Sequence, residues 1–250
     1  MSTDTWLIRP HPRSSPALRL ICLPYAGGSA SIYCPWGRHL PDSVELIAVQ
    51  PPGRASRIAE PPCPDMQTLV GAVGAALAML PNCPYVLFGH SLGSRVAYAL
   101  GMHSSMLGLV PPRLLIASGS RAPHLPGRRA PVHDLPDDLF KEWLRAFGGT
   151  PHALLDDAEF MDLLMPALRA DFSIADQYRA EPAPLPCPVQ VLTGSHDTDV
   201  TPEESQAWMA LSNGHCDIHS IDGGHFFIHS HAEQVLSHIK DAISPLLPLR

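Results

Sequence analysis

The sequence predicts an α/β protein with a mostly parallel, doubly wound sheet, and three observations support this prediction. Short apolar, β-branched or Leu-rich runs alternate along the chain with longer helix-compatible stretches, the pattern of strands joined by crossover helices. With 250 residues, 45% of them hydrophobic and 16% charged, the chain is long and apolar enough to bury a full core. It contains no internal repeat and no low-complexity tract. We therefore expect one domain that spans residues 1–250.

The strands of this sheet are expected at six apolar runs: residues 18–24, 44–49, 85–88, 113–117, 189–193 and 216–221. Two stretches between them have the length and spacing of crossover helices. The first is residues 66–80, which places Leu69, Val73, Leu77 and Leu80 on one face. The second is residues 92–102. Helices are expected on both faces of the sheet.

One interval departs from this alternation. About seventy residues separate the runs that end at 117 and begin at 189, whereas a crossover usually needs about a dozen or more. Residues 135–147 carry Leu139, Trp143 and Phe147 at helical spacing. Residues 159–178 carry Phe160, Leu163, Leu164, Leu168 and Phe172 in the same way. We expect a helical lid inserted over residues 121–185.

The second of these helices has two further signals. Asp156 or Asp157 precedes it and is suited to cap its first turn. Pro166 lies inside it and predicts a kink or a break into two helices, because proline removes a backbone donor and clashes with the preceding turn.

The charge balance and the absence of targeting signals narrow the function. Seventeen Lys and Arg against twenty-four Asp and Glu give a net charge of −7, so no basic field favours nucleic acid or anionic lipid. No apolar run has the length of a membrane span, and residues 1–16 lack the features of a signal peptide. The six cysteines show no C-x-x-C spacing, which favours reduced thiols over a zinc ribbon or a disulfide framework. We expect a cytoplasmic protein.

The most informative motif is Gly89-His90-Ser91-Leu92-Gly93, which follows one expected strand and precedes an expected helix. A serine between a strand and a helix lies in a sharp, strained turn that small flanking residues tolerate, and its Oγ is lifted above the sheet edge. The following helix directs its positive N-terminal end at a developing oxyanion. Ser91 is the candidate nucleophile.

A serine nucleophile needs a histidine base and a carboxylate that orients it. Asp197 and Asp199 follow one expected strand, and His225 follows the next, after two glycines. Both positions are at carboxyl ends of strands, where open α/β sheets place their ligand sites. From the residues alone, either aspartate is able to reach the imidazole. A metal site at His225, His229 and His231 is not expected, since these residues have no carboxylate or Cys partner at helical spacing.

The turn after the first expected strand offers donors for an oxyanion. Residues 23–29, Leu-Pro-Tyr-Ala-Gly-Gly-Ser, form a turn of small residues whose backbone N–H groups are accessible. The N–H of Leu92, just after the nucleophile, would complete the oxyanion hole.

These motifs, in this order, resemble the type II thioesterases of nonribosomal peptide and polyketide synthesis, within the α/β-hydrolase superfamily. The resemblance runs from about residue 20 to 236. Besides the serine motif it rests on residues 24–31 (PYAGGSAS) with Trp36, 50–54 (QPPGR) with Arg57, 118–124 (SGSRAPH), 148–151 (GGTP), 166–171 (PALRAD) and 223–226 (GGHF). Two positions depart from the family pattern: Tyr25 where many relatives have His, and Pro51 where many have Leu.

The resemblance implies an α/β-hydrolase fold with a helical lid and a role for each site residue. It assigns Ser91 as nucleophile, Asp197 rather than Asp199 as the acid, and His225 as base. It places the oxyanion donors at the backbone N–H groups of Ala26 and Leu92. No metal and no cofactor are implied.

The implied substrate is an acyl or aminoacyl thioester on the phosphopantetheine arm of an acyl- or peptidyl-carrier protein, and hydrolysis would free a stalled or misprimed arm. Arg121, Arg128 and Arg129, where the chain leaves the sheet for the lid, are expected to receive the arm's phosphate or the acidic face of the carrier. Two alternatives remain open on sequence: a carboxylesterase or acyl-CoA hydrolase with the same triad, and a non-catalytic module that docks on carriers.

Overall fold

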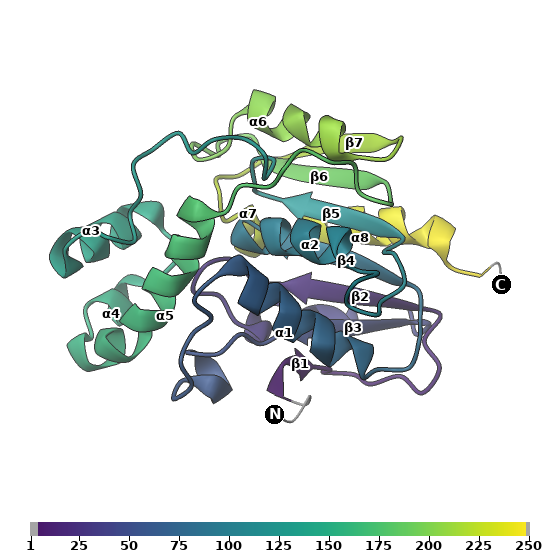
Figure 1. Ribbon diagram of the computed structural model, residues 1–250, viewed down its shortest axis with the longest axis horizontal. Coiled ribbons are helices and arrows are strands. Elements are labelled where there is room, and N and C mark those ends of the chain that lie inside the picture. The colour runs from purple at the N-terminus through teal and green to yellow at the C-terminus, as the bar shows by residue number, and fades with distance from the viewer. Residues whose placement is uncertain (1–4, 249–250) are drawn as a thin grey trace.

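A computed structural model describes residues 5–248, the side chain of His152 aside, and a seven-stranded sheet lies at its centre in the order β1-β3-β2-β4-β5-β6-β7 (Figure 1). The strands are β1 (Leu7–Ile8), β2 (Leu18–Leu23), β3 (Val44–Val49), β4 (Tyr85–His90), β5 (Leu114–Ser118), β6 (Val189–Gly194) and β7 (Cys216–Ile221). Neighbouring strands are parallel except β1, which pairs antiparallel with β3. The predicted mostly parallel sheet is confirmed. The sequence analysis missed β1, because two residues are too few to show a period.

Helices cover both faces of the sheet. In β2, Ile21 and Leu23 pack into the apolar cluster that contains α1 (Met66–Ala78) and α2 (Leu92–Met102). Leu20 and Cys22 point to the opposite cluster, which contains α8 (Ala232–Ile243) and the 3₁₀ helix Cys34–Arg38. Successive residues of a buried strand thus contribute to two cores, which explains why these runs are continuously apolar rather than alternating. Two short helices, α6 (Pro202–Gln206) and α7 (Phe227–Ser230), follow β6 and β7.

Three helices lie between β5 and β6: α3 (Asp137–Phe147), α4 (His152–Leu155) and α5 (Ala158–Gln177). They lie beyond the carboxyl ends of the strands, toward which the arrowheads of β2 and β5 point (Figure 1). They share an apolar cluster of their own, made of Val132, Phe140, Leu144, Leu155, Met161, Met165, Leu168 and Phe172. The insertion therefore stands on its own core at the end of the sheet where a ligand would bind.

Helix α5 differs from its sequence prediction in two respects: it is not broken at Pro166, and Leu163, which was expected on the apolar face, is 59% exposed. The Asp157 side chain accepts a hydrogen bond from the N–H of Phe160 and caps the helix, which selects Asp157 from the two predicted caps. The helix then continues through Pro166 without a break, so the prediction of two helices is wrong. Burial of Met161, Met165 and Leu168 around the proline stabilises the helix against the loss of one backbone hydrogen bond.

The apolar face of α3 is also shifted from its prediction. Leu139 is 50% exposed, and the buried positions are Phe140 and Leu144. The spacing correctly indicated a helix, but which side faces the insertion's core depends on how α3 lies against α5. Within residues 5–248, none of the helices combines the length and apolar character needed to cross a lipid bilayer.

Candidate active site

Ser91 lies at the turn between β4 and α2 in a strained conformation, with φ 53° and ψ −116°. Its backbone N–H donates to the carbonyl of Ser118 at 2.8 Å. A Cβ on Gly89 would come within 2.1 Å of the Gly93 carbonyl oxygen, and a Cβ on Gly93 within 2.1 Å of the Leu23 carbonyl oxygen. Both glycines are therefore required by close backbone approach, and together they hold the serine in a conformation that L-residues rarely adopt.

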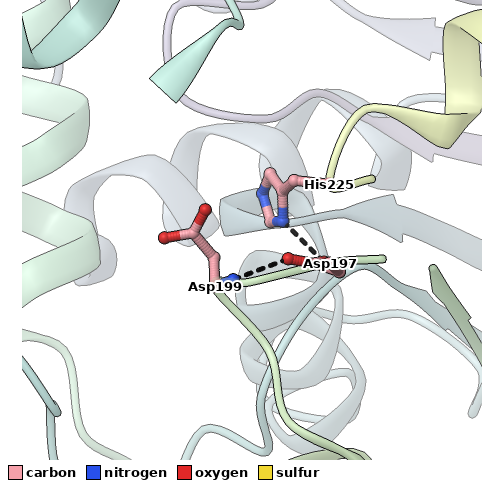
Figure 2. Close-up of side chains that lie close together, drawn as sticks. All are labelled: Asp197, Asp199 and His225. Carbon is pink, nitrogen blue, oxygen red and sulfur yellow. Dashed lines mark hydrogen bonds and ion pairs between the residues drawn. The ribbon is translucent and has the colours of Figure 1, made fainter. Parts of the chain in front are cut away.

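A hydrogen-bonded chain joins Ser91 to His225 and Asp197. The Nε2 atom of His225 lies 3.1 Å from Ser91 Oγ. Its Nδ1 atom lies 2.8 Å from Asp197 Oδ2, the contact that Figure 2 shows. Asp197 follows β6 and His225 follows the adjacent strand β7, so the parallel pairing brings two distant segments together. The three side chains lie at the carboxyl edge of the sheet in the order that a nucleophile, its base and an orienting carboxylate require.

Asp197 rather than Asp199 contacts the imidazole. The Asp197 side chain is fully buried, and its Oδ1 accepts hydrogen bonds from the N–H groups of Asp199 at 2.8 Å and Val200 at 3.2 Å. The Asp199 carboxylate points away from Asp197 (Figure 2) and pairs with Arg129 at 3.0 Å. The loop thus turns around Asp197, and the carboxylate two residues later joins the wall of the cavity.

Asp197, Asp199 and His225 also bring ligand atoms within 4.8 Å of one another, as a metal site would. Their ligand atoms are already engaged, however. Both nitrogens of His225 have hydrogen-bonding partners, Asp197 accepts from three donors, and Asp199 pairs with Arg129. This donor set fits a proton relay better than a metal centre. The side chains of His229 and His231 have other hydrogen-bonding partners. His229 Nε2 lies 2.8 Å from the Tyr25 hydroxyl, and His231 Nδ1 lies 2.9 Å from Ser230 Oγ.

Ala26 and Leu92 line the same cavity as Ser91 and His225, and their backbone N–H groups are the candidate oxyanion donors. Among the described residues, neither N–H donates to a protein acceptor. The next two N–H groups of the turn are engaged: that of Gly27 donates to Asp171 Oδ2 at 2.7 Å and that of Gly28 to the Tyr25 carbonyl at 2.8 Å. Two free donors therefore flank the serine, as an oxyanion hole requires.

A buried ion pair links this turn to the insertion. Arg54 and Asp171, 3% and 6% exposed, form two hydrogen bonds of 2.5 and 3.0 Å, and Asp171 also accepts the Gly27 N–H. Gly27 has φ 78°, and a Cβ there would come within 2.5 Å of Leu168 on α5. Sequence reasoning included Arg54 and Asp171 among the family motifs but gave them no role, because no local pattern signals a contact between residues so far apart.

The cavity at Ser91 has a volume of about 370 Å³ and is rich in arginine. Arg121, Arg128 and Arg129 all line it. Arg121 donates to the carbonyls of Leu125 and Pro126, Arg128 contacts Glu204 at 3.0 Å, and Arg129 lies 4.5 Å above the Trp143 ring. The structure thus brings the three predicted arginines to the cavity that holds the serine. Sequence reasoning missed a fourth arginine of this wall, Arg95 on α2.

Aromatic rings also pack against His225. Phe147 and Phe226 lie 5.1 and 5.0 Å from its ring, and Phe226 packs against Tyr25. Burial raises the pKa of Tyr25 to about 12 and lowers the pKa of His229. Both groups are therefore neutral near pH 7, and the tyrosine hydroxyl shares a hydrogen bond of 2.8 Å with His229 Nε2. These rings contribute to the burial of His225, which is 9% exposed.

Comparisons with known proteins identify the family. Residues 18–243 match the model of the thioesterase domain. The gramicidin S biosynthesis protein GrsT of Aneurinibacillus migulanus is 35% identical over 227 residues, which cover 90% of this chain and 89% of GrsT. The thioesterase PikA5 of Streptomyces venezuelae is 37% identical over 243 residues, covering 96% and 86%. The structure of the type II thioesterase BorB from the borrelidin biosynthetic cluster superposes with a TM-score of 0.86 at 35% identity, covering 96% of this chain and 98% of BorB. The chain therefore belongs to the thioesterase family, which confirms the resemblance to type II thioesterases and the predicted α/β-hydrolase fold, and it is a hydrolase that acts on thioesters.

Proposed function

We propose that this enzyme hydrolyses acyl or aminoacyl thioesters held on the phosphopantetheine arm of a carrier protein, and so frees stalled or misprimed arms in nonribosomal peptide or polyketide synthesis. The observation that carries the chemistry is the chain of hydrogen bonds from Ser91 through His225 to Asp197. The carrier-bound substrate is supported by relatives such as GrsT and PikA5, whose names link them to antibiotic synthesis or thioesterase activity. We place the reaction in the cytoplasm.

In the first step, His225 Nε2 takes the proton of Ser91 as Oγ attacks the thioester carbonyl. Asp197 accepts a hydrogen bond from Nδ1–H, which fixes the tautomer that leaves Nε2 free to act as base. The oxyanion of the tetrahedral intermediate receives hydrogen bonds from the N–H groups of Ala26 and Leu92. The carbon–sulfur bond then breaks, the sulfur takes up the proton held on His225 Nε2 so that the arm leaves as a thiol, and the acyl group stays on Ser91.

In the second step, His225 Nε2 takes a proton from the water that attacks the acyl-enzyme, and it gives this proton to Ser91 Oγ as the ester bond breaks and the acid leaves. A thiol has a pKa of about 8.5, so the arm leaves the tetrahedral intermediate with little assistance from an acid. We therefore expect hydrolysis of the acyl-enzyme to limit turnover, so that the acylated serine accumulates.

The insertion over residues 121–185 would act as the lid of this site, and its first arginines would receive the arm. The side chains of Arg128 and Arg129 are 47% and 42% exposed while they also line the cavity. This position at the entrance suits contact with the phosphate of the arm or with the acidic face of a carrier, and Arg121 lies next to it on the same wall.

The test compares kcat/KM on a carrier-bound thioester, on the matching acyl-CoA and on a simple ester. We expect the carrier-bound thioester to be preferred. Equal or faster hydrolysis of acyl-CoA, or of the ester, would instead indicate an acyl-CoA hydrolase or a carboxylesterase. Mass spectrometry should show a burst of acyl-enzyme, and its absence would indicate a non-catalytic docking module.

The control is Ser91→Ala, which should lower the rate by at least about 10⁴-fold, because nothing else in the site supplies a nucleophile. The melting temperature should not fall, since the serine hydroxyl makes no contact with the packed core. Substantial residual turnover would remove Ser91 from its proposed role.

A further inference from the structure

Two segments of the active site come from distant strands of the sheet. The turn that carries Ala26 follows β2, and the loop that carries His225 follows β7, while β4, β5 and β6 lie between these strands (Figure 1). Strand pairing therefore does not join the proposed oxyanion donor directly to the base. Both groups must nevertheless be placed accurately around the carbonyl that Ser91 attacks, because a donor stabilises an oxyanion only at hydrogen-bonding distance.

A hydrogen bond joins these two segments. The hydroxyl of Tyr25 lies 2.8 Å from Nε2 of His229 on α7. Tyr25 directly precedes Ala26 in the turn, and His229 is the fourth residue after the base. Within residues 5–248, no other hydrogen bond connects the turn, residues 24–29, with the loop and α7, residues 222–230.

An aromatic side chain packs beside this hydrogen bond. Phe226 lies edge-on to both Tyr25 and His225, with 5.1 and 5.0 Å between the ring centroids. Tyr25 is 9% exposed, so its hydrogen bond is shielded from water. Burial raises the pKa of Tyr25 to about 12 and lowers the pKa of His229, so neither group carries a charge near pH 7. The hydrogen bond therefore adds no charge beside His225 and Asp197.

We infer that Tyr25 and His229 are positioning residues, and that their hydrogen bond holds the oxyanion donor of Ala26 in place relative to the catalytic base. This inference rests on the proposed function and adds two residues to its mechanism. Neither side chain lines the cavity at Ser91, so both act through the turn and the loop rather than on the substrate. Asp171 holds the next N–H of the turn from the insertion, and it does not link the turn to the base.

The test removes the hydrogen bond from each side in turn. Tyr25→Phe removes the hydroxyl and His229→Phe removes the ring nitrogen, while both keep an aromatic ring in place. His229→Gln restores a polar atom near the position of Nε2. The matched control is Tyr85→Phe, because Tyr85 is also buried and its hydroxyl donates to the Val110 carbonyl at 2.7 Å, at the end of β4 opposite to Ser91. Rates are measured on the propionyl thioester of N-acetylcysteamine, a small substrate that needs no carrier.

Tyr25→Phe and His229→Phe should each lower kcat by about tenfold and change KM by less than about twofold, because a displaced donor weakens the transition state more than the bound substrate. The double variant should be no slower than the single variants, since both substitutions remove the same hydrogen bond. His229→Gln should recover most of the lost kcat, and Tyr85→Phe should keep the wild-type kcat.

Three results would overturn the inference. The first is a wild-type kcat in Tyr25→Phe or in His229→Phe. The second is a double variant in which the two single losses multiply, because the residues would then act independently. The third is an equal loss of kcat in Tyr85→Phe, which would indicate general destabilisation. Either single variant tests the hydrogen bond if the other does not fold.

A transition-state analogue separates positioning from other damage to the site. Ser91 Oγ adds to the carbonyl carbon of a trifluoromethyl ketone and its proton passes to His225, so the adduct carries the oxyanion that the Ala26 N–H would bind. Tyr25→Phe should raise the Ki of the ketone about tenfold, in proportion to the loss of kcat. The Ki of a thioether analogue, which has no carbonyl, should stay at the wild-type value.

Equal increases of both inhibition constants would show a disturbed substrate site and would overturn the inference. Failure of the proposed function would appear in the wild type instead, as a preference for acyl-CoA or an ester over the carrier-bound thioester. That result would leave the ratios between variants unchanged, because they are measured on a substrate without a carrier.

Discussion

Asp197 and Asp199 lie only two residues apart but have different partners. Asp197 contacts Nδ1 of His225 and, in the proposed mechanism, fixes its tautomer, whereas Asp199 pairs with a partly exposed arginine. Asp197→Asn should therefore lower kcat by about 10⁴-fold, because the amide would favour the wrong tautomer. Asp199→Asn should lower kcat by less than about tenfold, since it removes only an exposed ion pair. Steady-state rates of both variants on one thioester test this pair, and the reverse ranking would contradict the assignment of Asp197.

Helix α5 controls the position of the turn that carries Ala26. Asp171 holds both Arg54 and the Gly27 N–H, so the N–H adjacent to the proposed oxyanion donor is fixed by the insertion. Asp171→Asn should lower kcat by about 10- to 100-fold with a smaller change in KM, because a displaced donor weakens transition-state binding. The matched control is Asp162→Asn, which changes an exposed carboxylate on the same helix.

The double variant Arg54→Met/Asp171→Leu removes the two buried charges together. Its melting temperature should therefore exceed that of Asp171→Asn, while its kcat should stay low. Recovery of kcat together with stability would show that the pair serves folding alone.

The whole molecule carries a net charge of −7, and an acidic carrier protein should be repelled by it except at a local basic patch. Arg128 and Arg129 at the cavity entrance form the patch that we propose. Replacing both by Glu should raise KM for a carrier-bound substrate more than KM for a small uncharged thioester. The difference should be largest at low ionic strength, because salt screens charges separated by more than about 10 Å at 0.1 M. Measurements of KM across a salt series test this. Equal increases on both substrates, independent of salt, would indicate damage to the insertion instead of lost docking.

The correctly predicted features are those encoded by residues that lie close together in the sequence. The six long strands, α1 and α2 lie within two residues of their predicted bounds, because apolar periodicity and turn residues are local signals. The strand–serine–helix turn is also local, since Gly89 and Gly93 are required by backbone contacts within that turn and with β2. The proposed triad of Ser91, Asp197 and His225 could be inferred from the sequence because each residue follows a strand, and parallel strands bring their carboxyl ends to one edge.

The remaining features depend on how distant segments pack. Whether Asp197 or Asp199 contacts His225 depends on how the loop after β6 closes on itself. The bond between Arg54 and Asp171, and the contact of Arg95 with the Ala175 carbonyl, depend on where α5 lies against the sheet. The same packing keeps α5 continuous through Pro166. A local sequence pattern indicates whether a segment prefers a helix, a strand or a turn. The partner of a buried charge is decided by packing instead, because the burial of apolar surface brings together residues that are far apart in the sequence.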